Sequence, residues 1–204
     1  MFGRCRDFTL LAVALFRELG IPARSRCGFA TYFNSGRFED HWVAEYWSDT
    51  EHRWVMVDAQ LDHVWQKMIS FRGNPLDITA SEFVVAGRAW QACRSGTLDP
   101  LLCGLSAINQ QGLYWVAGNT RLDVAALNKV EMLPWDVWGM GLPPTSPVPD
   151  DLAPFDSLAE LSAHPDVHFD ALLGRYAGDD MVRVGTHVFN VLRNQSDDVS
   201  SLFV

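Results

Sequence analysis

The hydrophobic pattern near the start of the chain has the period of a helix. Its apolar positions recur every three or four residues: Phe8, Leu11, Leu15 and Leu19. Gly20 and Pro22 follow this run, and both residue types end helices. We therefore expect a helix that begins near Arg6 and ends near Leu19.

Three segments rich in aromatic and β-branched residues come next, at residues 23–33, 41–48 and 53–59. The stretches that separate them, residues 34–37 and 49–52, are polar and typical of turns. Because short apolar segments bounded by turns form strands that fold back on one another, this pattern predicts three antiparallel strands after the helix.

Two capping patterns predict later helix starts. Thr79 and Glu82 are three residues apart, so their side chains can accept hydrogen bonds from the unpaired amides of a first helical turn. We expect this helix to run to about Arg94, and a second helix to begin at Thr120 with Asp123. The remaining predicted elements are helices at 157–163 and 166–175 and an alternating strand segment with Val182, Val184 and Val188.

A change in composition divides the chain. Residues 139–151 hold four prolines and two glycines and cannot continue a helix or a strand. The net charge is −9, and residues 150–204 carry 3 basic and 10 acidic residues. We therefore expect a first domain over residues 1–138, a linker over residues 139–151, and an acidic extension over residues 152–204 that packs on the first domain.

Composition excludes several classes of protein. Hydrophobic residues make up 48% and charged residues 20% of the 204 residues, and no apolar run approaches the roughly 18 residues of a membrane span. An acidic chain without a basic stripe is not typical of proteins that bind nucleic acid or anionic membranes. We expect neither of these partners.

The cysteines indicate a reducing environment. They stand at positions 5, 27, 93 and 103, too few and too scattered for a disulfide framework, and they form no Cys-x-x-Cys pair. The first residues also lack the order of charges, apolar run and cleavage site that marks a signal peptide. Free thiols and a cytoplasmic location are the expectation.

A cysteine, a histidine and an aspartate stand where the predicted elements would let them meet. Cys5 lies just before the first helix, where unpaired amides and the helix dipole favour a thiolate. A hairpin loop at residues 49–52 places Asp58 opposite Val43, on the same sheet face as His41. The three side chains are the nucleophile, base and orienting carboxylate that covalent acyl transfer needs.

Four short motifs surround these residues. They are Gly3-Arg4-Cys5-Arg6-Asp7, Gly20-Ile21-Pro22-Ala23-Arg24, His41-Trp42-Val43-Ala44-Glu45-Tyr46 and Trp54-Val55-Met56-Val57-Asp58. Over residues 3–60 they resemble the cysteine motif, helix exit, histidine strand and aspartate strand of the transglutaminase-like superfamily. The intervals of 36 residues from Cys5 to His41 and 17 residues from His41 to Asp58 also suit that family.

This resemblance implies an α+β, papain-like fold, with an N-terminal cysteine helix packed on an antiparallel sheet and a mostly helical C-terminal part. It implies a cofactor-independent reaction in which Cys5 attacks an amide or other acyl carbonyl, His41 moves the proton, and Asp58 orients His41. The expected substrate is a peptide or a small amide or thioester. Three activities stay open: amide hydrolase or acyltransferase, amide-forming biosynthetic enzyme, and catalytically degenerate binding module.

The resemblance also raises a question about the oxyanion hole, the donors that bind the developing negative charge. Members of the family commonly use a side chain from a helical segment before the cysteine to help the cysteine's own amide. Only four residues precede Cys5 in this sequence, so the helper is missing or lies elsewhere. Trp115, Trp135 and Trp138 are candidates, although core packing is the plainer role for each.

The candidate substrate contacts are Gln60, Trp42 and Trp135. Gln60 lies two residues after Asp58 on the same predicted strand face, Trp42 follows the histidine, and Trp135 lies in an aromatic segment beside a carboxylate. The alternative roles are a plain strand end for Gln60 and core packing for the tryptophans.

One pair of histidines has the spacing of metal ligands. His164 and His168 are four residues apart, but Pro165 stands between them and no third ligand is evident from the sequence. We therefore expect no metal site.

Overall fold

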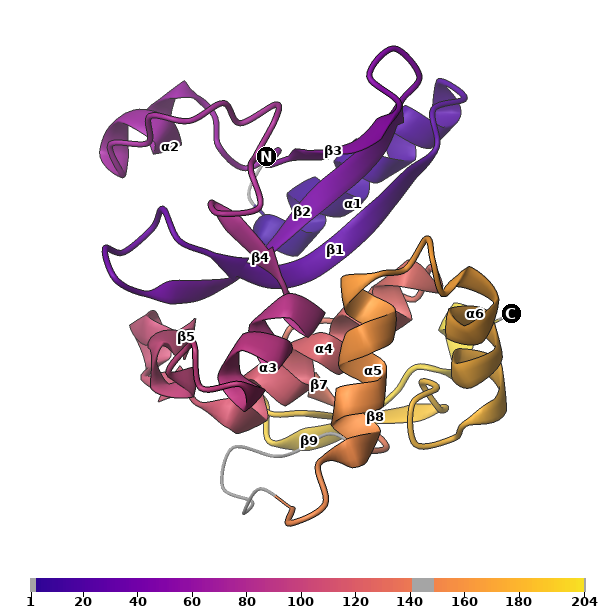
Figure 1. The fold of residues 1–204 in the computed structure, drawn as a ribbon. Coiled ribbons are helices and arrows are strands. Elements are labelled where there is room, and N and C mark those ends of the chain that lie inside the picture. The colour runs from indigo at the N-terminus through magenta and orange to yellow at the C-terminus, as the bar shows by residue number, and fades with distance from the viewer. Residues whose placement is uncertain (1–2, 141–148, 204) are drawn as a thin grey trace.

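A helix and three antiparallel strands form the upper part of the molecule in Figure 1. The computed structural model describes residues 3–140 and 149–203. In it, α1 (Cys5–Glu18) lies along a sheet that begins with β1 (Ala23–Ala30), β2 (Phe38–Ser48) and β3 (Arg53–Val57). The helix ends as expected, because Gly20 adopts a left-handed φ of 76° just beyond it.

The predicted hairpin register is confirmed. β2 and β3 pair with Ser48 opposite Arg53 and Ala44 opposite Val57. β1 pairs antiparallel with β2, and Gly28 lies opposite His41. The strand ends differ from the prediction, since β1 stops at residue 30, β2 starts at residue 38 and β3 stops at residue 57. The mixed α+β class is confirmed as well.

Further short strands extend the sheet on both sides. They are β4 (Phe83–Val85), β5 (Cys103–Leu105) and β6 (Gln110–Gln111). The order is β4-β1-β2-β5-β6, with β3 also paired to β2. β5 runs parallel to β2, so the sheet is mixed rather than purely antiparallel.

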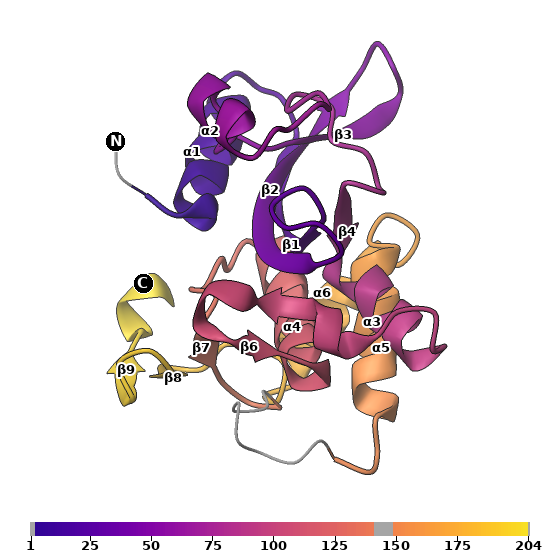
Figure 2. The ribbon, with the colours of Figure 1, turned by 90° about the vertical axis from the view of Figure 1, so that its left-hand side faces the viewer.

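Most of the helices gather at the lower end of the β1–β2 pair in Figure 2. They are α3 (Ala86–Arg94), α4 (Leu113–Leu127), α5 (Ala153–Ala163) and α6 (Phe169–Gly178), while α2 (His63–Met68) lies at the other end. α3, α4 and α5 contact one another, and α4 also contacts β1. Three single 3₁₀ turns occur at Pro100–Leu102, Ser106–Ile108 and Ser200–Phe203.

The predicted helix start at Thr79 is wrong. Glu82 does accept a hydrogen bond from the Thr79 amide at 2.9 Å, so the capping contact exists. The chain nevertheless makes a turn there and enters β4, because residues 83–85 add a strand beside β1, and α3 begins only at Ala86. Tertiary pairing with β1 overrides the local signal.

The second predicted helix start is also wrong, because Thr120 and Asp123 lie inside α4. The Thr120 hydroxyl donates to the Val116 carbonyl one turn earlier, which is a mid-helix contact. α4 is buried on nearly all sides from Val116 to Ala126. A helix of this kind carries no amphipathic stripe from which its true start could be read.

The C-terminal valine segment forms a separate small sheet. β7 (Asp136–Val137), β8 (His187–Asn190) and β9 (Gln195–Asp198) pair antiparallel, apart from the main sheet. Val188 lies in β8, whereas Val182 and Val184 precede it as buried residues outside a strand. Most of the predicted linker, residues 141–148, lies outside the described residues.

A buried ion network joins the sheet to the helices. Arg26 on β1 is 3% exposed and donates to Asp123 on α4 at 2.9 and 3.1 Å and to Glu45 on β2 at 3.0 Å. Asp123 is fully buried and also accepts from the Cys27 amide at 2.7 Å and the Ser162 hydroxyl at 2.7 Å. Each buried charge therefore has partners, and the network fixes α4 and α5 against β1.

Candidate active site

Cys5 is the first residue of α1 and is half-buried. Its amide is among those at a helix start that have no intrahelical partner, so it is free to donate. The neighbouring residues hold this end in place. Asp7 accepts from the Arg4 amide at 3.0 Å, and the Arg6 guanidinium donates to the Glu131 and Met132 carbonyls. The first turn of α1 is thus tied to the chain just after α4.

His41 on β2 connects the other two predicted residues. Its Nε2 donates to Asp58 Oδ2 at 2.7 Å, and the two residues are 2% and 3% exposed. The Cys5 thiol also lies close enough to His41 to raise the pKa of its imidazole. The structure therefore brings Cys5, His41 and Asp58 together in one relay.

The electrostatics of the relay favour a charged imidazole. Burial lowers the pKa of His41, but the charge and hydrogen bond of Asp58 and the proximity of Cys5 outweigh it and raise this pKa to about 10. Burial would raise the pKa of Asp58, yet the His41 charge and the hydrogen bonds it accepts hold that pKa below its ordinary value. An imidazolium between an aspartate and a thiol stabilises the thiolate form of the thiol.

Asp58 is held by three donors at once. Besides His41, it accepts from the Tyr32 hydroxyl at 2.6 Å on Oδ2 and from the Gln60 amide at 2.9 Å on Oδ1. Gln60 lies in a turn after β3 rather than on a strand face, so the contact that the structure gives it is made by its backbone. Three donors fix the carboxylate and require it to stay ionised.

Sequence reasoning missed the aromatic residues around His41. The rings of Tyr32, Phe33 and Phe83 lie edge-on to the imidazole, with centroids 6.0, 4.9 and 6.4 Å away. These side chains exclude water from the His41–Asp58 hydrogen bond and so strengthen it. The only sequence signal was the aromatic pair at residues 32 and 33. These residues fell within the predicted first strand, and the pattern indicated no function for them.

A second carboxyl group lies next to the relay. Asp40 precedes His41, and its Oδ2 accepts from the Trp115 indole at 2.7 Å. Burial raises the pKa of Asp40 to about 7, although hydrogen bonds from Trp115 and Asn119 oppose the rise. Asp40 therefore changes its charge near neutral pH, beside the residue that carries the proton.

A large cavity adjoins the relay. It has a volume of about 760 Å³ and lies between α4 and the strands β7 and β8. Its walls are mainly apolar and include Tyr114, Trp115, Trp135, Val137, Phe189 and Leu192. Its volume falls within the range of about 300–1,000 Å³ that is usual for small-molecule sites.

Two wall residues of this cavity contact the neighbours of the relay. The Arg4 guanidinium, one residue before Cys5, lies over the Trp135 ring at 4.0 Å from the centroid. The Trp115 indole donates to Asp40, one residue before His41. The cavity walls thus contact the residues that precede Cys5 and His41 in the chain.

Trp42 does not lie in the open site. It is fully buried in a cluster with Cys27 and Leu122, because successive strand residues point to opposite faces and His41 occupies the other face. Cys5 packs against this same cluster. The Trp42 indole N–H is buried with no hydrogen-bond partner among the described residues. The predicted role of Trp42 as a substrate contact is therefore not supported.

Two of the three tryptophans considered as oxyanion donors are otherwise engaged. The Trp138 indole donates to the Val182 carbonyl at 2.8 Å, and the Trp115 indole donates to Asp40. Trp135 lines the cavity beside Arg4. Of the three, only Trp135 keeps its indole N–H outside the hydrogen bonds of the described residues.

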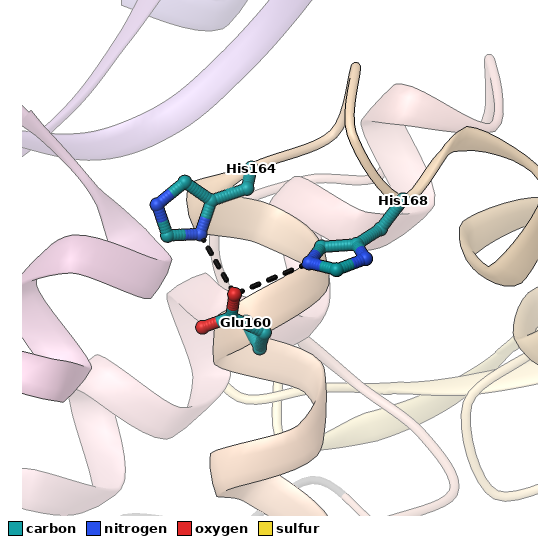
Figure 3. Close-up of side chains that lie close together, drawn as sticks. All are labelled: Glu160, His164 and His168. Carbon is teal, nitrogen blue, oxygen red and sulfur yellow. Dashed lines mark hydrogen bonds and ion pairs between the residues drawn. The ribbon is translucent and has the colours of Figure 1, made fainter.

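A separate cluster gathers possible metal ligands at the junction of α5 and α6 (Figure 3). Glu160 lies between His164 and His168, and one ligand atom of each lies within 4.8 Å of the others. The structure supplies in Glu160 the third ligand that was not evident from the sequence. The spacing of 160, 164 and 168 follows helical turns, so this signal was present in the sequence as a third member four residues upstream.

Comparison with known families agrees with this geometry. The sequence model of the transglutaminase-like superfamily matches residues 2–59, which contain all three residues of the relay. Over these residues the chain is similar to the transglutaminase-like superfamily. No curated protein and no solved structure matches the chain. Among the described residues, no helix combines the length and apolar character needed to cross a membrane.

The transglutaminase-like segment is smaller than the folded unit that surrounds it. The match ends at residue 59, whereas the cavity beside the relay is built from α4, β7 and β8. The superfamily is commonly one of cysteine-dependent enzymes. The Cys5–His41–Asp58 cluster therefore lies in the matched segment, and the cavity walls come from residues beyond the match.

Proposed function

We propose that this transglutaminase-like protein is a cysteine-dependent amide hydrolase or acyltransferase that works through a thioester acyl-enzyme. The observation that carries the proposal is the relay itself, in which His41 is hydrogen-bonded to Asp58 and Cys5 lies close enough to raise the pKa of the imidazole. A degenerate binding module has no need of a buried, fully hydrogen-bonded histidine–aspartate pair, because burying such groups is costly. The relay therefore favours catalysis.

The first half of the proposed reaction forms the acyl-enzyme. His41 already holds the thiol proton as an imidazolium, and the thiolate sulfur of Cys5 attacks the acyl carbonyl carbon of the substrate. The carbonyl oxygen becomes negative in the tetrahedral intermediate. As the carbon–nitrogen bond breaks, His41 returns the proton to the departing amine, which leaves the acyl group on Cys5 as a thioester.

The second half releases the acyl group. Water, or an acceptor amine, loses a proton to His41 and attacks the thioester carbonyl. The carbon–sulfur bond then breaks, and the proton on His41 restores the thiol or its ion pair. Hydrolysis is our first choice because it requires no second binding site. Throughout, Asp58 keeps Nε2–H of His41 oriented and offsets the positive charge.

We assign the stabilisation of the oxyanion to the backbone N–H of Cys5, which has no intrahelical hydrogen-bond partner at the start of α1. The helix dipole adds to this donor. We assign Trp135, which stands on the cavity wall beside Arg4, to the acyl chain rather than to a second oxyanion donor.

The cavity suggests the kind of acyl group. Its aromatic and aliphatic walls suit a bulky apolar acyl chain of a small amide or thioester, and the contact of Trp135 with Arg4, next to Cys5, supports a substrate bound on this side. This feature also keeps the amide-forming alternative open, because a carrier-bound acyl thioester would present the same chain. The four cysteines are free thiols, which supports a reducing, cytoplasmic setting.

The test uses activated esters as acyl donors. We expect p-nitrophenyl hexanoate to acylate Cys5, seen as one added hexanoyl group by intact mass and located by peptide mapping. Cys5→Ala should take up no acyl group, whereas the matched control Cys93→Ala, a half-buried cysteine elsewhere, should behave as the wild-type protein. Acylation that persists in Cys5→Ala would overturn the proposal.

Chain length tests the cavity separately. Trp135→Ala should raise KM for the hexanoyl ester and leave acylation by the acetyl ester nearly unchanged, because a two-carbon group does not reach the wall. An equal effect on both esters would assign Trp135 to the oxyanion instead of the acyl chain.

A further inference from the structure

The junction of α5 and α6 carries a second constellation of reactive side chains. Glu160 lies in the last turns of α5, His164 directly follows that helix, and His168 directly precedes α6. Backbone hydrogen bonds continue through the break, from the His164 amide to the Glu160 carbonyl and from the His168 amide to the His164 carbonyl, both at 3.1 Å. The helical spacing is thus kept, and all three side chains face one side (Figure 3).

The three side chains converge on one oxygen atom. Glu160 Oε1 lies 3.0 Å from His164 Nδ1 and 3.2 Å from His168 Nε2. An ion bound at about 2.0–2.2 Å by imidazole nitrogen and carboxylate oxygen sets its ligand atoms about 3 Å apart. The separations found here match that requirement with small side-chain rotations.

One contact in this cluster is poorly explained without an ion. Despite the 3.0 Å separation from Glu160, His164 Nδ1 is buried and has no hydrogen-bond partner of acceptable geometry among the described residues. A buried ring nitrogen without a partner is costly. An ion held between the nitrogen and the carboxylate would satisfy both lone pairs at once.

The surroundings of Glu160 leave one of its two carboxylate oxygens available to bind an ion. The Gln91 amide on α3 donates to Glu160 Oε2 at 2.8 Å, which leaves Oε1 for the histidines. Such an outer contact orients a ligating carboxylate. The C-terminal third of the chain is also rich in acidic residues, with 10 acidic and 3 basic residues over 150–204, so the local field attracts cations.

We propose that Glu160, His164 and His168 form a binding site for a divalent transition-metal ion, with Zn²⁺ as the preferred occupant. Two imidazoles and one carboxylate select this class over Mg²⁺ and Ca²⁺, which prefer oxygen ligands alone. Three protein ligands leave a fourth position open for water or a ligand. Next to it is a cavity of about 360 Å³ that His164 and Asp166 help to line. The ion would also fasten the end of α5 to the start of α6, independently of the acyl-transfer function proposed above.

Titration of the full chain with Zn²⁺ after chelator treatment tests the site. We expect one ion per chain at this site by isothermal titration calorimetry. Loss of an outer contact to a ligand weakens metal affinity roughly 10–100-fold, and Gln91→Ala should weaken Zn²⁺ binding within that range. Glu160→Gln and His168→Ala each remove a ligand and should weaken Zn²⁺ binding by more. The matched control is His187→Ala, an exposed histidine on β8, which should bind as the wild-type protein does.

A second readout separates this site from the thiols. Bound Co²⁺ should give visible ligand-field bands without a sulfur-to-cobalt charge-transfer band, and these bands should vanish in His168→Ala. Zn²⁺ should raise the melting temperature of the wild-type protein but not that of Glu160→Gln, whose metal-free melting temperature should be unchanged. Zn²⁺ binding unaffected by these changes, a thiolate band, or no binding at millimolar Zn²⁺ would overturn the proposal.

Discussion

Replacement of Asp58 by asparagine tests how the relay holds its proton. Asp58 accepts three hydrogen bonds, from the His41 ring, the Tyr32 hydroxyl and the Gln60 amide. Asparagine has one acceptor oxygen and one donor NH₂ group. The Gln60 amide can only donate, so the oxygen turns toward it and the NH₂ faces His41. His41 Nε2 must then accept, its proton moves to Nδ1, and the ring can no longer take the proton of Cys5.

The size of the effect follows from the charge that Asp58 stabilises. Together with Cys5, Asp58 raises the pKa of His41 from 6.5 to about 10. At 1.36 kcal/mol for each pKa unit this net rise is roughly 5 kcal/mol, and it sets the scale of the Asp58 contribution, since burial opposes the rise and Cys5 adds to it. A loss of about 10³–10⁴-fold in turnover is therefore expected for Asp58→Asn, in line with the usual cost of a misplaced triad tautomer.

Two measurements check this reasoning. Turnover of the hexanoyl ester gives the rate, and ¹⁵N chemical shifts of the His41 ring report which nitrogen carries the proton. Asp58→Asn should keep its fold and show the proton on Nδ1, whereas the wild-type ring should be doubly protonated near neutral pH. A variant that keeps turnover within tenfold of the wild-type rate, or keeps the proton on Nε2, would refute the hydrogen-bond argument.

Three further predictions concern the surroundings of the relay. Tyr32→Phe removes one of the donors to Asp58 and should lower turnover about tenfold, the worth of one hydrogen bond to a charged group; a loss as large as that of Asp58→Asn would contradict this. Asp123→Ala leaves the buried Arg26 without one of its partners and should lower the free energy of unfolding, measured with urea, by about 3–5 kcal/mol. A decrease below about 1 kcal/mol would show that the network is not a major source of stability. Asp40 has a folded pKa of about 7, above its unfolded value, so the wild-type protein should lose stability as pH rises from about 4 to 7. Asp40→Asn should remove most of that loss when unfolding is compared at pH 4 and pH 8, and an unchanged slope would contradict it.

Local patterns were enough to predict the part of the fold that carries the relay. The period of α1, its stop at Gly20 and the turn at residues 49–52 are all short-range signals, and the hairpin register follows from the turn alone. Since that register sets which residues share a sheet face, the sequence alone places His41 and Asp58 together. The pairing of Cys5 with them needed the long-range packing of α1, which the resemblance supplied.

The rest depended on contacts between distant segments. Thr79 carries the signature of a helix start, yet pairing with β1 turns the following residues into a strand. α4 is buried all round, so its start at Leu113 leaves no periodic trace. The cavity beside the relay unites residues near 115, 135 and 190, and no spacing in the sequence indicates that they meet. The contact of Tyr32 with Asp58 is of the same kind.

The most direct test of the central claim is the pH dependence of Cys5 alkylation by iodoacetamide, followed by peptide mass spectrometry. Because the pKa of His41 is raised to about 10, the imidazolium persists up to that pH, and a cation beside Cys5 should make this sulfur react faster at neutral pH than an unassisted thiol, whose pKa is about 8.5. An unassisted thiol at that pKa is only about 3% ionised at pH 7, so a roughly thirtyfold advantage over N-acetylcysteine is expected at that pH. His41→Ala should abolish the advantage. Alkylation of wild-type Cys5 that rises through about pH 8.5 as a free thiol does, with or without His41, would contradict an activated nucleophile.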